Sequence, residues 1–194
     1  MGEKSVQKRE YIIEKARKVF SEKGYRSVTM KDIVEECGIS RGGLYLYFDS
    51  TKEVFEAVLQ SEAAKAEDNF ASEIKDADTA TDILTIFLRE QKKEILRKKN
   101  SLTAAIYEYY FDSAVSKKSN GYKSNFEGNV KILGTLIEGG VKSGEFVCED
   151  PKGMAKHIML VIEGLKASSC TMGITEDAVN KEILIIMSSL VEEE

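Results

Sequence analysis

Apolar residues near the start of the chain recur at intervals of three and four, the spacing of a helix that buries one face. Between Val6 and Lys23 the apolar positions share one side, and most charged positions fall elsewhere. Gly24 follows, and glycine commonly closes a helix because it readily adopts the left-handed conformation. The pattern therefore predicts a first helix over residues 6–23.

Two shorter helices are predicted next, each preceded by a hydroxyl side chain that can cap it. Thr29 precedes the stretch 30–37 and has an acid, Asp32, three residues later, which is a variant of the capping box. A glycine ends that helix, and Ser40 precedes the next one, over residues 41–47. Two short helices joined by a tight glycine turn are typical of a helix-turn-helix. We expect their shared core to contain Ile33, Ile39 and Leu44.

The remaining chain shows six further helical stretches, separated by turn-forming residues. Asp150 followed by Pro151 is a strong start signal for one of them. An alternating strand pattern is confined to the short segment 145–148. The sequence thus predicts an all-α protein, with later helices over 51–74, 79–99, 101–117, 122–142, 151–171 and 176–191.

Composition supports a helical protein with a sizeable core. The 194 residues are 42% hydrophobic and 31% charged, with one proline against an average usage of roughly 5%. No stretch reaches the approximately 20 apolar residues of a membrane span, and the N-terminus lacks the apolar region of a signal peptide. Three separated cysteines and one histidine disfavour a disulfide scaffold, a metal site and a histidine-based nucleophile pair. We expect a cytoplasmic protein that is no enzyme, binds no membrane and carries neither metal nor cofactor.

The charge is divided unevenly along the chain. A formal net charge of −5 argues by itself against nucleic acid as a partner, because phosphate-binding proteins need a positive surface. Residues 1–52, however, hold 11 basic and 8 acidic residues, whereas the rest hold 17 and 25. The net charge is therefore +3 on the helix-turn-helix and −8 elsewhere, a distribution that favours DNA binding by the N-terminal part.

One long, ordered motif runs through the helix-turn-helix. It reads Phe-x-x-x-Gly-Tyr from position 20, Thr-Met-x-x-Ile from position 29, and Gly-Ile-Ser-x-Gly-x-Leu-Tyr-x-Tyr-Phe from position 38. These residues resemble the DNA-binding domain of the tetracycline-repressor (TetR) family of bacterial transcriptional regulators. The resemblance implies a three-helix DNA-binding domain over residues 1–50 and a larger helical effector-binding and dimerisation domain over 51–194.

The resemblance also implies which side chains meet DNA: Thr29, Ser40, Arg41, Gly42, Gly43, Tyr45, Tyr47 and Lys52. Arg41 is long enough to reach either a guanine edge or a phosphate. The two tyrosines either contact DNA or pack the helix. Gly43 departs from the small or polar side chain usual in the family, and Thr51 stands where the family commonly has a lysine, with Lys52 one position later. Adjacent glycines weaken a helix by about 1 kcal/mol each, so Gly43→Ala is expected to raise thermal stability.

The larger domain offers two further predictions. The last two helices carry apolar stripes, which form either a buried core or, as the resemblance implies, a four-helix dimer interface through Ile158, Ile162, Leu165, Ile183, Ile186, Met187 and Leu190. Aromatic and neighbouring side chains of the middle helices form either plain core or an apolar effector pocket with few polar groups. The candidate pocket residues are Phe87, Tyr107, Tyr110, Phe111, Tyr122, Phe126, Met159 and Glu163.

Taken with the resemblance, the sequence predicts a ligand-responsive transcriptional regulator. A homodimer would bind a palindromic operator in double-stranded DNA and act as a repressor that a small-molecule effector releases; activation is the other sign of regulation. The alternatives are a helical ligand-binding protein or enzyme whose helix-turn-helix is only structural, and an interaction module that acts through its acidic helices.

Overall fold

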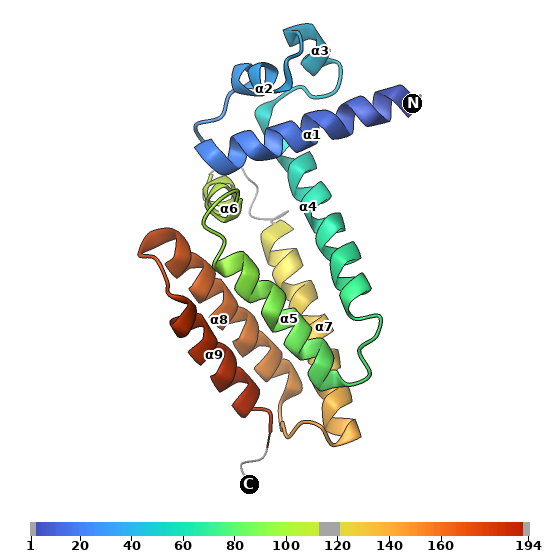
Figure 1. The fold of residues 1–194 in the computed structure, drawn as a ribbon, viewed down its shortest axis with the longest axis vertical. Helices are drawn as coiled ribbons and strands as arrows, with labels where there is room; N and C mark the ends of the chain where they lie inside the picture. The colour runs from blue at the N-terminus through green and yellow to red at the C-terminus, as the bar shows by residue number, and fades with distance from the viewer. Residues whose placement is uncertain (1–2, 113–120, 192–194) are drawn as a thin grey trace. The chain divides into compact units, whose positions relative to one another are not determined.

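The computed structural model describes residues 3–112 and 121–191, and the regular secondary structure in these ranges is entirely α-helical (Figure 1). The helices are α1 (Glu3–Lys23), α2 (Met30–Cys37), α3 (Arg41–Tyr45), α4 (Thr51–Glu73), α5 (Ala80–Ile95), α6 (Thr103–Tyr110), α7 (Gly121–Ser143), α8 (Pro151–Thr171) and α9 (Glu176–Ser188). The all-α prediction is confirmed, and the segment 145–148 is not a strand. Among these helices, none is both long and apolar enough to cross a membrane.

The chain forms two compact units, and each draws on two separate stretches of sequence. Within the described part, unit 1 contains residues 3–69 and 98–112, and unit 2 contains residues 70–97 and 121–191. These units differ from the predicted ranges 1–50 and 51–194, because the first part of α4 and all of α6 pack with the N-terminal helices. The predicted functional division after residue 50 stays a prediction.

Unit 1 is held together by an aromatic cluster. Phe20 of α1, Phe55 of α4 and Tyr109 of α6 are buried, and the Phe20 and Phe55 ring centroids lie 4.7 Å apart. Tyr25 meets Tyr109 edge to face at 5.0 Å. The Tyr109 hydroxyl donates to Glu56 at 2.6 Å, and burial together with this carboxylate raises the pKa of Tyr109 well above its ordinary value. Helices from distant parts of the sequence thus share one core.

The start of α2 is capped as the sequence predicts. The Thr29 hydroxyl accepts from the Asp32 backbone N–H, and the Asp32 carboxylate accepts from the Thr29 backbone N–H at 2.8 Å. Lys23 donates to the same carboxylate at 2.6 Å, and these hydrogen bonds hold the pKa of Asp32 well below its usual range. Gly38 ends the helix with φ +61°, which only glycine adopts at no steric cost. The capping box therefore fixes where α2 begins.

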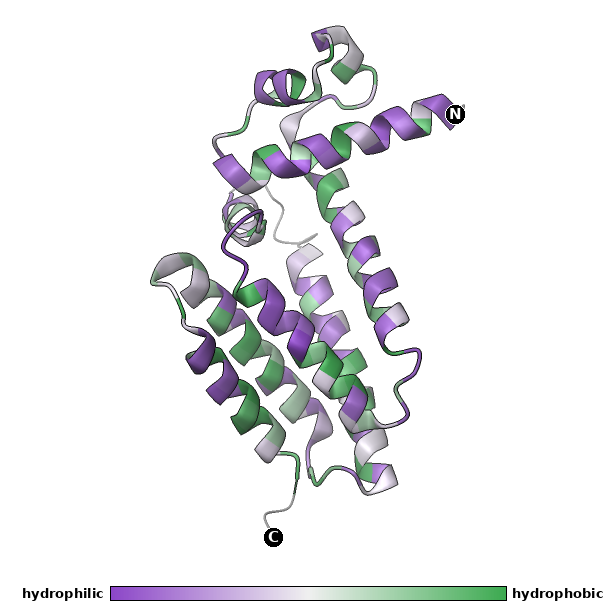
Figure 2. Ribbon diagram, in the orientation of Figure 1, coloured by the Kyte–Doolittle hydropathy of each residue, from purple (hydrophilic) through white to green (hydrophobic). Residues whose placement is uncertain are grey.

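Unit 2 packs α5, α7, α8 and α9 around a second apolar core, whose buried members include Leu84, Leu88, Ile137, Ile158 and Ile186. In Figure 2 these helices show green, hydrophobic positions alternating with purple ones along their length. Asp150 caps α8, accepting from the Gly153 backbone N–H at 2.9 Å. The predicted Asp150-Pro151 start of α8 is therefore confirmed.

A single carboxylate joins the start of α5 to the turn after α7. Glu145 accepts from the Thr81 backbone N–H at 2.9 Å and from the Thr81 hydroxyl at 3.0 Å. The Ser143 hydroxyl donates to its other oxygen at 2.8 Å. These donors favour the charged form and lower the pKa of Glu145 to about 2.

Glu145→Gln is expected to destabilise unit 2 at neutral pH and to reduce the stability that is lost when the pH falls. The folded-state pKa lies below the value of about 4.3 in an unfolded chain, so Glu145 stabilises the fold above that value and loses this effect as pH falls toward 2. Denaturant unfolding at pH 7 and pH 3 should therefore show a smaller difference between variant and wild type at pH 3. Glu149→Gln, at an exposed position nearby, is the control. A constant difference at both pH values would refute the assignment.

Candidate nucleic-acid interface

The short helix α3 is fixed from its inner side and capped at its start. The Ser40 hydroxyl accepts from the Gly43 backbone N–H at 3.1 Å, as the sequence predicts. Leu44 and Phe48 are 0% and 1% exposed and belong to the unit 1 core, where the sequence places them. The opposite side of α3 is thereby oriented toward solvent.

That outer side carries a cation, an aromatic ring and an open stretch of backbone. Arg41, Gly42 and Tyr45 are exposed, and the Arg41 guanidinium carbon lies 5.6 Å from the Tyr45 ring centroid. Among the residues that the structure describes, Arg41 has no carboxylate within ion-pair distance. A side chain added at Gly42 would meet nothing within 4 Å. The surface can therefore approach another molecule closely and offer it an uncompensated positive charge.

The other predicted DNA contacts are placed less uniformly. Thr29 is exposed, and its hydroxyl accepts from the Asp32 backbone N–H, so it caps α2 whether or not it meets phosphate; the same hydroxyl donates to the Asp32 carboxylate at 2.6 Å. Tyr47 is half-buried, and its ring packs against the unit 1 core. Lys52 is exposed and lies 3.9 Å from Glu56, one turn along α4. Contact with DNA stays a prediction for each of the eight residues.

The acidic residues of α2 are all neutralised by neighbouring lysines. The three pairs are Lys23–Asp32 at 2.6 Å, Lys31–Glu35 at 3.7 Å and Lys18–Glu36 at 3.1 Å. Pairs at a surface add little to stability. Their electrostatic consequence is that α2 presents little uncompensated negative charge.

Gly42→Ala is expected to raise the midpoint of thermal unfolding, because alanine is favoured over glycine inside a helix by up to about 1 kcal/mol and the new methyl group meets open space. Gly43→Ala should gain less or nothing, since its methyl group would lie 3.2 Å from the Ser40 hydroxyl that caps α3. The structure therefore predicts that alanine stabilises the protein at position 42, rather than at position 43 as expected from the sequence. Melting curves of the two single variants test this order, and a larger gain from Gly43→Ala would contradict it.

The predicted effector residues fall into both compact units. Tyr107, Tyr110 and Phe111 belong to unit 1, where Tyr110 packs against the core and meets Tyr109 edge to face at 5.0 Å. Burial raises the pKa of Tyr110. Phe111 is 78% exposed. The assignment of these three residues to the pocket stays a prediction, and Tyr110 packs partly buried against the core of unit 1.

The other five effector candidates all belong to unit 2. The Tyr122 hydroxyl of α7 donates to the Glu163 carboxylate of α8, and Lys166 lies 3.5 Å from the same carboxylate. Met159 is buried, and Phe87 and Phe126 pack partly buried against the same core. A few polar groups on helices that also carry aromatic and aliphatic side chains are the composition expected of a small-molecule site, and the effector role of these residues stays a prediction.

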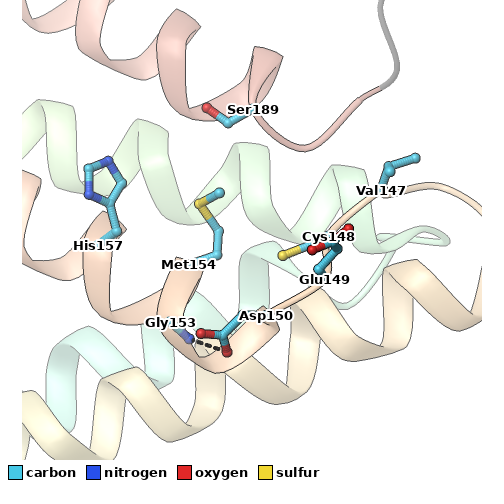
Figure 3. A pocket seen from close by; sticks show the side chains of 8 residues that line it. All are labelled: Val147, Cys148, Glu149, Asp150, Gly153, Met154, His157 and Ser189. Carbon is cyan, nitrogen blue, oxygen red and sulfur yellow. Dashed lines mark hydrogen bonds between the residues drawn. The ribbon is translucent and has the colours of Figure 1, made fainter.

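A hollow of about 390 Å³ lies elsewhere in unit 2, where the start of α8 meets the preceding loop and the end of α9 (Figure 3). Met154, His157 and Ser189 line it together with the loop residues 147–150. None of the predicted effector residues lines this hollow. Within residues 3–112 and 121–191, no group of three or more His, Cys, Asp or Glu side chains is arranged to hold a metal ion.

Four of the predicted dimer residues lie in the core of a single chain. Ile158, Ile162, Ile186 and Leu190 are 0–2% exposed and so offer a partner little surface, and the dimer assignment stays a prediction. Leu165, Ile183 and Met187 are partly buried. The exposed apolar side chains of α8 and α9 are others, which the sequence reasoning missed: Leu160, Leu184 and Ile185. For Leu184 and Ile185 the signal was the apolar run at 183–187, which is too wide for one buried stripe.

Comparison with known proteins agrees with this architecture over both units. The family model described as "Bacterial regulatory proteins, tetR family" matches residues 12–58, which include α2 and α3. A second model, "Tetracyclin repressor-like, C-terminal domain", matches residues 83–180, half of the chain. The chain belongs to the tetR family. Its helix-turn-helix is accordingly that of a tetR-family transcriptional regulator.

Individual tetR-family relatives resemble the chain over different lengths. The HTH-type transcriptional regulator YfiR of Bacillus subtilis is 29% identical over 159 residues, covering 79% of this chain and 76% of YfiR. The HTH-type transcriptional repressor AcnR of Corynebacterium efficiens is 36% identical over 64 residues, covering 33% of this chain and 34% of AcnR. A solved transcriptional regulator from Saccharomonospora viridis, in complex with choline, has a TM-score of 0.86 at 20% identity and covers 97% of this chain and 100% of its own.

Proposed function

We propose that this tetR-family chain is a ligand-responsive repressor, which binds a palindromic operator as a homodimer in the cytoplasm and leaves it when a small molecule binds. The observation that carries the proposal is the solvent-facing side of α3, with Arg41 and Tyr45 exposed and Gly42 open to close approach. Recognition helices insert such positions into the major groove. The name of AcnR as a repressor supports the sign of regulation.

The dimer is proposed to form through the exposed apolar face of α8 and α9. Leu160, Leu184 and Ile185 are each more than half exposed although they lie on helices whose other sides form the core. Burial of such side chains in a partner would remove apolar surface from water. A homodimer carries two α3 helices, one for each operator half-site, and such half-sites are separated by about 34–36 Å or a multiple of that distance.

The effector is proposed to bind at the unit 2 cluster of Phe87, Tyr122, Phe126, Met159 and Glu163. An organic molecule with an apolar part and a polar group could compete with Tyr122 for the Glu163 carboxylate. Similar folds accommodate ligands of different kinds, since the Saccharomonospora viridis regulator holds choline and the FadR regulator of Bacillus subtilis, with a TM-score of 0.75 at 19% identity, holds stearoyl-CoA. The effector must bind the DNA-free state more tightly, or it shifts nothing.

The test is a binding titration of effector-free dimer against fragments of the genome that encodes it, including the promoter of its own gene. We expect salt-sensitive binding to a palindromic site, and release on adding back the small molecule extracted from the purified protein. No binding to any fragment would overturn the proposal and favour a helical ligand-binding protein with a structural helix-turn-helix.

Arg41→Ala is expected to weaken operator binding by about tenfold or more, the effect of losing one base or phosphate contact in each half-site. A smaller salt dependence would assign Arg41 to phosphate, and relaxed preference at one base pair would assign it to guanine. Tyr47→Phe removes only a hydroxyl from a ring that packs on the core and should weaken binding less. Arg97→Ala, at an exposed position on unit 2, is the matched control. Unchanged binding by both helix-turn-helix variants would refute this placement of the interface.

A further inference from the structure

Leu46 has the most exposed large apolar side chain of the helix-turn-helix, and it is not among the residues predicted to contact DNA. Leu46, the residue that follows α3, is 81% exposed, whereas its neighbours Leu44 and Phe48 are buried. A single exposed leucine is ordinary on a protein surface. Its position is what distinguishes Leu46, because the residues around it form the side of α3 that faces away from the core.

Leu46 lies one helical turn beyond Gly42. Its backbone is helical, with φ −69° and ψ −18°, and its N–H donates to the Gly42 carbonyl at 3.2 Å. Residues four apart share a face of a helix, and nothing lies within 4 Å of where a Gly42 side chain would begin. The isobutyl group of Leu46 therefore borders open space created by the missing side chain of Gly42.

The same short helix carries the positive charge that DNA binding requires. Arg41 and Tyr45 stack on each other on the same exposed side of α3, and the sequence up to residue 52 has a net charge of +3. In the major groove, the one strongly apolar feature of a base edge is the C5-methyl group of thymine. An exposed aliphatic side chain on the same short helix as a guanidinium and an open glycine matches such a mixed polar and apolar surface.

We propose that Leu46 and Gly42 form a notch that receives the C5-methyl group of one thymine in each operator half-site. The inference rests on the proposed DNA-binding function and adds a determinant of sequence specificity to it. Leu46 reads the methyl group by apolar contact alone. The contribution of this contact to operator binding should therefore not depend on salt, and Leu46 should accept the same methyl group on 5-methylcytosine.

The experiment measures the affinity of the full-length dimer for its operator and for operators in which symmetric pairs of thymines are replaced by uracil. One pair should cost wild type about tenfold, the factor expected when two methyl groups lose their apolar contact. Leu46→Ala should bind the thymine operator about tenfold more weakly, with an unchanged salt dependence, and should lose nothing further on uracil at that pair. Ile132→Ala, which truncates a 68% exposed aliphatic side chain of α7, should behave as wild type.

A second comparison isolates the methyl group from the base pair. Operators carrying cytosine or 5-methylcytosine at the sensitive position differ by that group alone, and wild type should prefer the methylated one by a similar factor while Leu46→Ala should not. Operator binding without any uracil effect, or an equal uracil effect in Leu46→Ala, would overturn the notch and leave the proposed function standing. Absence of operator binding by wild type would overturn both.

Discussion

Phe55→Ala is expected to lower the free energy of unfolding by about 3–5 kcal/mol, the usual cost of removing a buried aromatic ring. Phe55 is fully buried, and its ring lies 4.7 Å from that of Phe20, 5.0 Å from that of Tyr25 and 5.3 Å from that of Tyr109. These neighbours come from α1, from the segment between α1 and α2, and from α6. The resulting cavity would touch every element that supports the helix-turn-helix.

The effect can be measured by denaturant unfolding followed by circular dichroism. A loss of this size is a large part of the 5–15 kcal/mol that stabilises a typical protein, so operator binding should also fall near the unfolding temperature. Phe111→Ala is the matched control, because Phe111 lies in the same unit but is 78% exposed. Similar destabilisation by both variants would show that the aromatic cluster does not dominate unit 1.

Gly140→Ala is expected to destabilise the protein by about 2–3 kcal/mol, against the ordinary preference for alanine in a helix. Its new methyl group would lie 2.9 Å from Cγ of Phe146 and closer still to two other carbons of that ring. Phe146 is 2% exposed and cannot swing into solvent. The Gly140 carbonyl also accepts from the backbone N–H groups of Glu145 at 2.9 Å and Phe146 at 3.1 Å, which holds the turn against the helix.

Gly139→Ala provides the control one residue earlier on α7. Gly139 is exposed, and a side chain there would meet nothing within 4 Å, so the substitution should be neutral or stabilise by up to about 1 kcal/mol. Thermal unfolding of the two variants should therefore shift in opposite directions. A stabilised Gly140→Ala variant would mean that Phe146 packs differently from the structure described above.

The features that sequence predicted well are those governed by neighbours along the chain. Caps at Thr29, Ser40 and Asp150 depend on a side chain and a backbone group three residues apart, and all three are present. Leu44 and Phe48 are buried because the spacing of the motif leaves them one common side. The outer face of α3 follows from the same spacing. Local chemistry therefore sufficed for the fold class and for the candidate DNA surface.

The sequence could not predict whether an apolar residue of a helix packs into the core of its own chain or stays exposed on the surface. Ile158 and Ile186 are buried within one chain, whereas Leu160 and Leu184 on the same helices are exposed, yet all four are aliphatic and lie in apolar stretches. The effector candidates show the same difficulty, since the pattern grouped Tyr110 with residues of unit 2, whereas in the structure Tyr110 packs against the core of unit 1. A pattern of apolar residues indicates that a helix face is buried, but it does not indicate what that face packs against.

Because unit 1 takes its last helix from residues that follow α5, the core of unit 1 is not confined to one N-terminal segment. A fragment ending at residue 50 would lack Phe55 and Tyr109, leaving Phe20 without the rings that enclose it. It would also lose the Glu108 carboxylate, which accepts from the Arg26 backbone N–H at 2.9 Å. A chimaera that exchanges DNA specificity between relatives should therefore transfer α6 together with the first four helices. Otherwise the core of unit 1 would combine residues from two different proteins.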